Sequence, residues 1–323
     1  MKLLTHRLLF LLLRARQARG NPEICPGWPR LLRKLAMTAI LFLLGILFYQ
    51  SSIAAPIHIV AAENFYASVA KEIGGSYVSV ESIMSQPDQD PHLFNVTPRI
   101  AKSLGRADLV VFNGLGYDAW MQGLLSVAAV AVQAKICVGQ LVNKKEGDNP
   151  HIWYDPATMP LYAKALLDFL VQKDPVHQVA YQANYQAFIK RYQRLSDLIQ
   201  QLKSQSQQVK VIATEPVFGY MANALGFDMQ GMAFQTSMMN GVDPSPQQVL
   251  EFQNALQTRR VKVLFYNKQV SSPLIQQLLK VAKRNAIPVI GITETQPANT
   301  TYSGWMSDQL HQLAKALHEH ASI

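Results

Sequence analysis

Short apolar runs rich in β-branched residues alternate with longer helical patterns along most of the chain. Runs that are apolar throughout suit strands buried on both faces, which is typical of parallel sheets covered by helices. The sequence therefore predicts an α/β fold. The predicted strands are Ile57–Ala61, Val78–Ile83, Ala107–Phe112, Lys135–Val138, Val209–Ala213, Val261–Tyr266 and Ile287–Ile292.

The strongest helical pattern lies between the fourth and fifth predicted strands. It begins at Asp174-Pro175, an N-cap residue followed by proline at the first helical position. Residues Pro175–Gln205 would form a helix about 45 Å long. We therefore expect two parallel-sheet α/β lobes joined by one long rigid helix, with modest motion between the lobes. The apolar stripe of this helix comprises Phe188, Tyr192, Leu195, Ile199 and Leu202.

The chain of 323 residues is long enough for two domains. We expect a leader over residues 1–55, an N-terminal lobe over 56–173, the linking helix over 174–207 and a C-terminal lobe over 208–323. The leader holds eight of the 30 basic residues and one of the 21 acidic residues, so nearly all of the net charge of +9 belongs to it. The rest of the chain is almost neutral, and a nucleic-acid partner is not expected.

The leader has the pattern of a signal peptide. Arg30, Arg33 and Lys34 precede the apolar run Ala36–Tyr49, and small residues follow just before Pro56. A helix of this length spans about 21 Å, which is short of the roughly 30 Å hydrocarbon core of a bilayer. We expect export to the periplasm and cleavage near Pro56; the alternative is an anchor that stays in the membrane.

The two cysteines have different surroundings. Cys25 has no apolar run just before it, so we expect a protein that is not a lipoprotein. Cys137 ends a predicted apolar strand and is expected to lie in the core rather than to act as a reactive thiol.

Two histidines each follow a proline, His92 in Asp90-Pro91-His92 and His151 in Asn149-Pro150-His151. Proline fixes its own φ and favours extended geometry in the residue before it, so each histidine leaves a stiff, non-helical corner. Neutral imidazole is a common metal ligand. A single histidine is more often a surface or core residue, but two such corners together indicate a metal site built from loops.

Two glutamates occupy similar places in the second half of the chain. Ligands of parallel α/β sheets bind beyond the carboxyl ends of the strands, and Glu215 and Glu294 each follow a predicted strand. A helix cap or a solvated loop would explain either glutamate alone. Taken with His92 and His151, they predict a metal site in the cleft between the two lobes.

Four sequence blocks match the pattern of a known family. They are Asp90-Pro91-His92-Leu93-Phe94 with Thr97-Pro98, Ala107-Asp108-Leu109-Val110 with Asn113-Gly114-Leu115-Gly116 and Trp120, Asn149 to Pro156 (NPHIWYDP), and Thr214 to Tyr220 (TEPVFGY). With these blocks the chain resembles, over about residues 56–318, the substrate-binding proteins of bacterial ATP-driven importers for zinc, manganese and iron.

The resemblance implies two α/β lobes, a rigid linking helix and a metal between the lobes. It implies that His92, His151, Glu215 and Glu294 are the ligands, although the residues around Glu294 match the family only loosely. The protein would capture one divalent ion, Mn²⁺, Zn²⁺ or Fe²⁺, as cargo in the periplasm. It would act as a monomer without catalysis and deliver the ion to an ABC permease in the inner membrane.

The residues leave the choice of metal open. Carboxylates suit manganese and ferrous iron better than an all-imidazole set does, yet affinity rises from manganese towards zinc at almost any such site. Residues 141–148 contain no histidine, whereas zinc-specialised relatives often carry a histidine-rich loop there. We therefore favour manganese or iron slightly over zinc.

An alternative function is an exported zinc-dependent hydrolase, in which two histidines and a glutamate hold zinc and leave its fourth position open. Glu294 would close that position, which argues against catalysis. Around the site we expect Trp153 and Tyr154 to pack, and Asp155 is a candidate hydrogen-bond partner for a ligating histidine.

Overall fold

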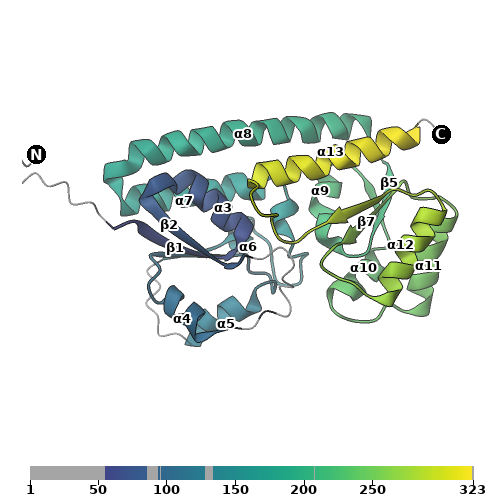
Figure 1. Ribbon diagram of the computed structural model, residues 1–323, viewed down its shortest axis with the longest axis horizontal. Coiled ribbons are helices and arrows are strands. Elements are labelled where there is room, and N and C mark those ends of the chain that lie inside the picture. The colour runs from purple at the N-terminus through teal and green to yellow at the C-terminus, as the bar shows by residue number, and fades with distance from the viewer. Residues whose placement is uncertain (1–54, 86–93, 95, 128–133, 207, 322–323) are drawn as a thin grey trace, which may run out of the picture. The chain divides into compact units, whose positions relative to one another are not determined.

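The computed structural model describes residues 55–85, 94, 96–127, 134–206 and 208–321 (Figure 1). Residues Pro56–Ile323 form one compact unit. His92, Cys25 and the expected signal peptide lie outside the described residues.

The first half of this unit contains a four-stranded parallel sheet with the strand order β2-β1-β3-β4. β1 and β3 are central and almost entirely buried, whereas β2 is a half-exposed edge strand. The elements are β1 (Ile57–Glu63), α3 (Asn64–Gly74), β2 (Val78–Met84), α4 (Pro98–Leu104), β3 (Leu109–Phe112), α5 (Ala119–Val127), β4 (Lys135–Cys137), α6 (Val138–Leu141), η3 (Ile152–Tyr154) and α7 (Thr158–Lys173).

The second half contains another four-stranded parallel sheet, in the order β6-β5-β7-β8. This order repeats that of the first sheet, although we find no internal repeat in the sequence. The elements are β5 (Lys210–Ala213), η5 (Pro216–Phe218), α9 (Gly219–Ala224), β6 (Asp228–Gln230), α10 (Met232–Met239), α11 (Pro246–Gln257), β7 (Val263–Asn267), α12 (Pro273–Arg284), β8 (Val289–Ile292) and α13 (Tyr302–Ala321).

The predicted linking helix is present as a short turn, η4 (Pro175–His177), followed by α8 (Gln178–Gln205). The 28 residues of α8 would extend about 42 Å. All five residues of its predicted apolar stripe are buried, and α8 packs against α3, α7 and α13 (Figure 1). Asp174 does not cap a backbone N–H; its carboxylate accepts instead from the Tyr181 hydroxyl at 2.8 Å.

One hydrophobic core runs through both halves, on the sheet faces that α3, α7, α8 and α13 cover. A separate cluster lies on the outer face of each sheet, against α4 and α5 in the first half and against α11 and α12 in the second. Both sheets are thus covered on both faces, which confirms the predicted α/β fold. Moving the halves apart would expose this shared core to water, so its burial resists such motion.

The structure departs from the predicted elements in two places. β6 was not predicted, because its three residues Asp-Met-Gln form no apolar run and pair only with β5 at the sheet edge. Cys137 is half-buried rather than in the core, and its thiol lies 3.8 Å from the Asn113 carbonyl oxygen.

Among the described helices, none has the length and apolar character needed to cross a membrane.

Candidate metal centre

In each sheet the strand order reverses between the two central strands, and polar residues gather at the carboxyl ends of these strands. Glu63 ends β1 and Asn113 follows β3; Glu215 follows β5 and Asn267 ends β7. Such a reversal leaves a crevice beyond the strand ends where α/β proteins bind ligands.

His151 is almost completely buried, with 1% of its surface exposed, at the start of η3. Its Nδ1 lies 2.6 Å from Asn149 Oδ1. The same Asn149 amide donates from Nδ2 to the Pro216 carbonyl oxygen at 2.7 Å, so the oxygen faces the imidazole. An amide oxygen only accepts, so Nδ1 carries a proton, and in the neutral imidazole the lone pair is on Nε2. That lone pair is on the side of Glu294, whose Oε2 lies 3.6 Å from Nε2.

Asn149 therefore has the role for which Asp155 was a candidate, and that expectation is wrong. Asp155 Oδ1 accepts from the Ala157 backbone N–H at 2.9 Å, an interaction within its own turn. The expected packing of the neighbouring aromatic residues is confirmed. The Trp153 ring lies 5.2 Å from the His151 ring, and the Tyr154 hydroxyl donates to the Thr293 carbonyl oxygen, next to Glu294.

Glu215 and Glu294 are both buried, with 7% and 2% of their surfaces exposed. Asn267 lies between them and donates from Nδ2 to both carboxylates, to Glu215 Oε2 at 2.7 Å and to Glu294 Oε1 at 2.5 Å. Asn267 was not among the residues predicted for the site. Asn267 comes directly after the apolar run Val261–Tyr266. This position could have marked it as a candidate site residue, because polar residues at strand ends often belong to a binding site.

The structure thus brings three of the four predicted ligands together: His151 faces Glu294, and Asn267 joins Glu294 to Glu215. The fourth, His92, lies outside the described residues. Within the described part of the chain, no three His, Cys, Asp or Glu side chains are grouped closely enough to hold a metal by themselves. Between the two carboxylates lies the Asn267 amide.

Two asparagines of the first half hold the backbone beside each glutamate of the second half. Asn149 donates to the Pro216 carbonyl oxygen, directly after Glu215. Asn64 exchanges two hydrogen bonds with the backbone of Gln296, at 2.8 and 2.9 Å, two residues beyond Glu294. Both glutamates are therefore positioned by contacts from the opposite half.

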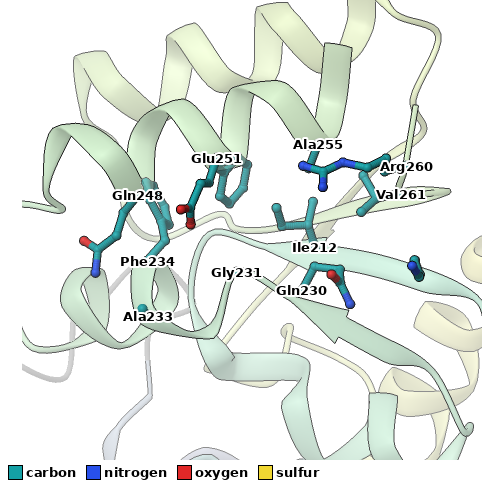
Figure 2. Close-up of a pocket in the computed structure, with 12 residues that line it drawn as sticks. Ile212, Gln230, Gly231, Ala233, Phe234, Gln248, Glu251, Ala255, Arg260 and Val261 are labelled. Atoms are coloured by element: carbon teal, nitrogen blue, oxygen red, sulfur yellow. The ribbon is translucent and has the colours of Figure 1, made fainter. Parts of the chain in front are cut away.

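A cavity of about 690 Å³ reaches this site, with Glu215, Asp148, Pro150 and Met239 among its lining residues. It offers an ion a route to Glu215. A second cavity, of about 210 Å³, lies where α10 and α11 meet β5 and β6 (Figure 2). Glu251 and Arg260 contribute to its lining, but none of the predicted ligands does.

Two further carboxyl groups, Glu63 and Asp118, are buried at the switch point of the first sheet. Asp118 accepts from the backbone N–H groups of Asn113 and Gly114, at 2.7 and 2.8 Å. Burial raises the pKa of Asp118 to about 6, although these N–H groups lower it. Burial, reinforced by the neighbouring Asp118 charge, also raises the pKa of Glu63 well above its ordinary value. Neither residue was singled out from the sequence.

The raised pKa of Asp118 predicts a pH-dependent effect of Asp118→Asn on stability. Because the folded-state pKa of about 6 exceeds the ordinary value of about 3.9, folding favours the protonated carboxyl. The stabilisation from the protonated Asp118 carboxyl is complete below about pH 4 and is lost as the pH rises through about 6. Asparagine stays neutral at every pH, and its amide oxygen accepts only one of the two N–H bonds, a loss that does not change with pH. Urea denaturation should show the variant gaining stability relative to the parent between pH 4 and 7, by up to about 3 kcal/mol; parallel pH profiles would contradict this.

Asn149→Ala should lower the free energy of unfolding by about 1–3 kcal/mol, because it leaves His151 Nδ1 and the Pro216 carbonyl without their amide partner. The matched control is Asn285→Ala, whose amide bonds only to Val281 in its own helix. Urea denaturation of both variants measures the difference. Equal losses in the two variants would show that the Asn149 contacts have no special weight.

Comparison with known proteins places this geometry in context. A family model described as zinc-uptake complex component A, periplasmic, matches residues 59–316. The manganese-binding lipoprotein MntA of Bacillus subtilis is 26% identical over 281 residues, which cover 81% of this chain and 90% of MntA. The iron-binding protein YfeA of Yersinia pestis is 25% identical over 238 residues, which cover 71% of this chain and 75% of YfeA.

Among solved structures, the periplasmic zinc-binding protein TroA from Treponema pallidum matches with a TM-score of 0.69 at 20% sequence identity. The match covers 81% of this chain and 99% of TroA. At this identity the likeness concerns the fold, and it agrees with two α/β lobes and a long helix.

The comparisons contradict the expectation of a periplasmic protein that is not a lipoprotein. MntA and several further relatives are named lipoproteins. The expectation rested only on the absence of an apolar run just before Cys25, and that local pattern is too little evidence to exclude a lipid anchor.

Proposed function

The chain belongs to the family of the periplasmic component A of zinc-uptake complexes, and from this premise we propose that it captures one divalent transition metal ion and delivers it to the permease of an ABC importer. The membership confirms the resemblance drawn from the four sequence blocks. The relatives include proteins named for manganese and for iron, so Mn²⁺, Zn²⁺ and Fe²⁺ are all proposed as cargo.

We propose His92, His151, Glu215 and Glu294 as the ligands. The observation that carries this proposal is the contact of 3.6 Å between His151 Nε2 and Glu294 Oε2, at a position where both side chains are buried. An imidazole lone pair and a buried carboxylate that face each other form a donor set suited to a transition metal. The shared amide of Asn267 brings Glu215 to the same place.

The charges of Glu215 and Glu294 also support their assignment as ligands of a metal ion. Two buried carboxylates are costly unless they are paired or bind a metal, and a divalent ion carries the charge that balances both. The segment that carries His92 follows β2, whose last residue, Met84, pairs with Glu63 at the carboxyl edge of the first sheet. β2 therefore ends at the same edge of the sheet as Glu63.

In this proposal the chain positions the ion and performs no reaction on it. Asn149 keeps the proton on His151 Nδ1, so that Nε2 remains a donor. The cavity that reaches Glu215 admits the ion. The shared core and the two asparagine contacts limit the motion needed to close around the ion to small displacements. We further propose that the protein acts as a monomer, without a nucleic-acid partner, and that its lobes span 56–173 and 208–323 around the helix 174–207.

The hydrolase alternative has no support in the comparisons, because the matching family is a component of an uptake complex. We infer that the protein is not an enzyme.

Removing an imidazole should abolish tight metal binding while leaving the fold intact. We expect His92→Ala and His151→Ala to weaken binding of Zn²⁺ or Mn²⁺ at least 100-fold, measured by competitive titration against a chelator. His311→Ala, on the exposed face of α13, is the control and should bind like the parent. In the parent, affinity should fall as the pH is lowered, because protons compete with the metal ion for the imidazole nitrogens. Full-strength binding by both variants would exclude these histidines from the site.

A further inference from the structure

Asn113 follows β3 at the carboxyl edge of the first sheet, a place that corresponds to that of Asn267 in the second sheet. It is completely buried, with 0% of its surface exposed. Its Oδ1 accepts from the Tyr66 hydroxyl at 2.8 Å, and its Nδ2 donates to the carbonyl oxygens of Gly114 at 3.1 Å and Pro150 at 2.9 Å. Turning the amide over would place an oxygen against two carbonyl oxygens, so its orientation is fixed.

The backbone of Asn113 is held as well. Its N–H donates to Asp118 Oδ2 at 2.7 Å, and its carbonyl oxygen accepts from the Gly139 N–H at 2.9 Å. Every polar group of this residue thus has a partner. A buried polar network whose members are all satisfied is rigid, so Asn113 is a fixed point to which a loop can be anchored.

The bond from Asn113 to Pro150 anchors the turn that carries His151. Pro150 directly precedes His151, and its carbonyl oxygen accepts from two donors. The N–H of Ile152, at 2.7 Å, closes the turn itself, whereas Asn113 joins the turn to the end of β3. Without the bond from Asn113, the turn could keep its shape and still shift relative to the sheet.

The residue on the other side of Pro150 is held by the second half of the protein. The carbonyl oxygen of Asn149 accepts from the Tyr220 hydroxyl at 2.8 Å. The side chain of Asn149 in turn presents Oδ1 to His151 Nδ1 at 2.6 Å. Two successive carbonyl groups, those of Asn149 and Pro150, are therefore held from opposite halves, and the contact between Asn149 and the imidazole depends on both.

We propose that Asn113 is a positioning residue for the metal site, which holds His151 in its ligating position before any ion binds. The inference rests on the proposed function of this site. A side chain that is already held in place loses little freedom when a ligand binds, so binding is tighter. Outer partners that orient a ligand in this way typically contribute a factor of about 10–100 to metal affinity.

Zinc titration of matched variants tests this role. Asn113→Ala and the polar Asn113→Ser both remove the bond to Pro150, and each should weaken Zn²⁺ binding at least about tenfold in competition with a chelator. Tyr66→Phe is the control, because it removes a buried hydrogen bond of the same amide but leaves the bond to Pro150. It should lose stability in urea and still bind zinc like the parent. A purely structural role would weaken binding in Tyr66→Phe as well.

A measurement on the parent protein does not depend on how the variants fold. With isotope-labelled histidine and all metal removed, the His151 Nδ1–H should give an NMR signal that exchanges slowly with water, identified by its absence in His151→Ala. The signal should be lost in Asn113→Ser and kept in Tyr66→Phe. A signal that appears in the parent only after zinc is added would overturn the proposal, because the ion would then be what orders the histidine.

The outcomes separate this role from the proposed function. If His151→Ala binds zinc as tightly as the parent, the proposed metal site is wrong, and Asn113 has no ligand to position. If His151→Ala loses binding while folded Asn113 variants retain the full affinity of the parent, the site stands and only the role of Asn113 is wrong.

Discussion

The buried charge of two glutamates at the carboxyl edge of one sheet is the constraint on which the rest of the site depends. Removing a carboxylate from water costs several kcal/mol even after the protein relaxes. Asn267 supplies one hydrogen bond to each glutamate, but a neutral amide cannot balance two charges. A divalent cation can, and the imidazole of His151 faces Glu294 from the other half of the protein. These contacts are the observations on which the proposed metal site rests.

The fold brings these groups together by using the same strand order twice. Each sheet reverses its order between two central strands, and each reversal places polar residues at the carboxyl edge. A continuous core beneath the site and the long helix α8 join the two sheets. Asn64 and Asn149 then fix the backbone next to each glutamate from the opposite half. The positions of the proposed ligands His151, Glu215 and Glu294 thus follow from packing that extends far beyond the site.

The strands and helices that have a regular apolar pattern along the chain could be predicted from the sequence. Seven of the eight strands in the described part of the chain coincide with apolar runs, and the stripe of α8 is periodic, because burial on a sheet or helix face imposes a pattern that can be read along the chain. The short edge strand β6 has no such pattern and was missed. Likewise, His151, Glu215 and Glu294 stand out by residue type and by their places after strands. The orienting groups do not, because Asn149 and Asn267 are ordinary amides that each bond a residue 27 or more positions away, at Pro216, Glu215 and Glu294. Asp155 was chosen as a partner by its charge, and the structure uses it within its own turn.

A crystal structure of the protein loaded with zinc, with anomalous diffraction recorded at the zinc edge, tests the central claim most directly. The proposal predicts one strong anomalous peak, in contact with His92, His151 Nε2 and the carboxylates of Glu215 and Glu294. A peak bound by other residues, or a fully loaded protein in which Glu215 and Glu294 remain joined only through Asn267, would contradict it.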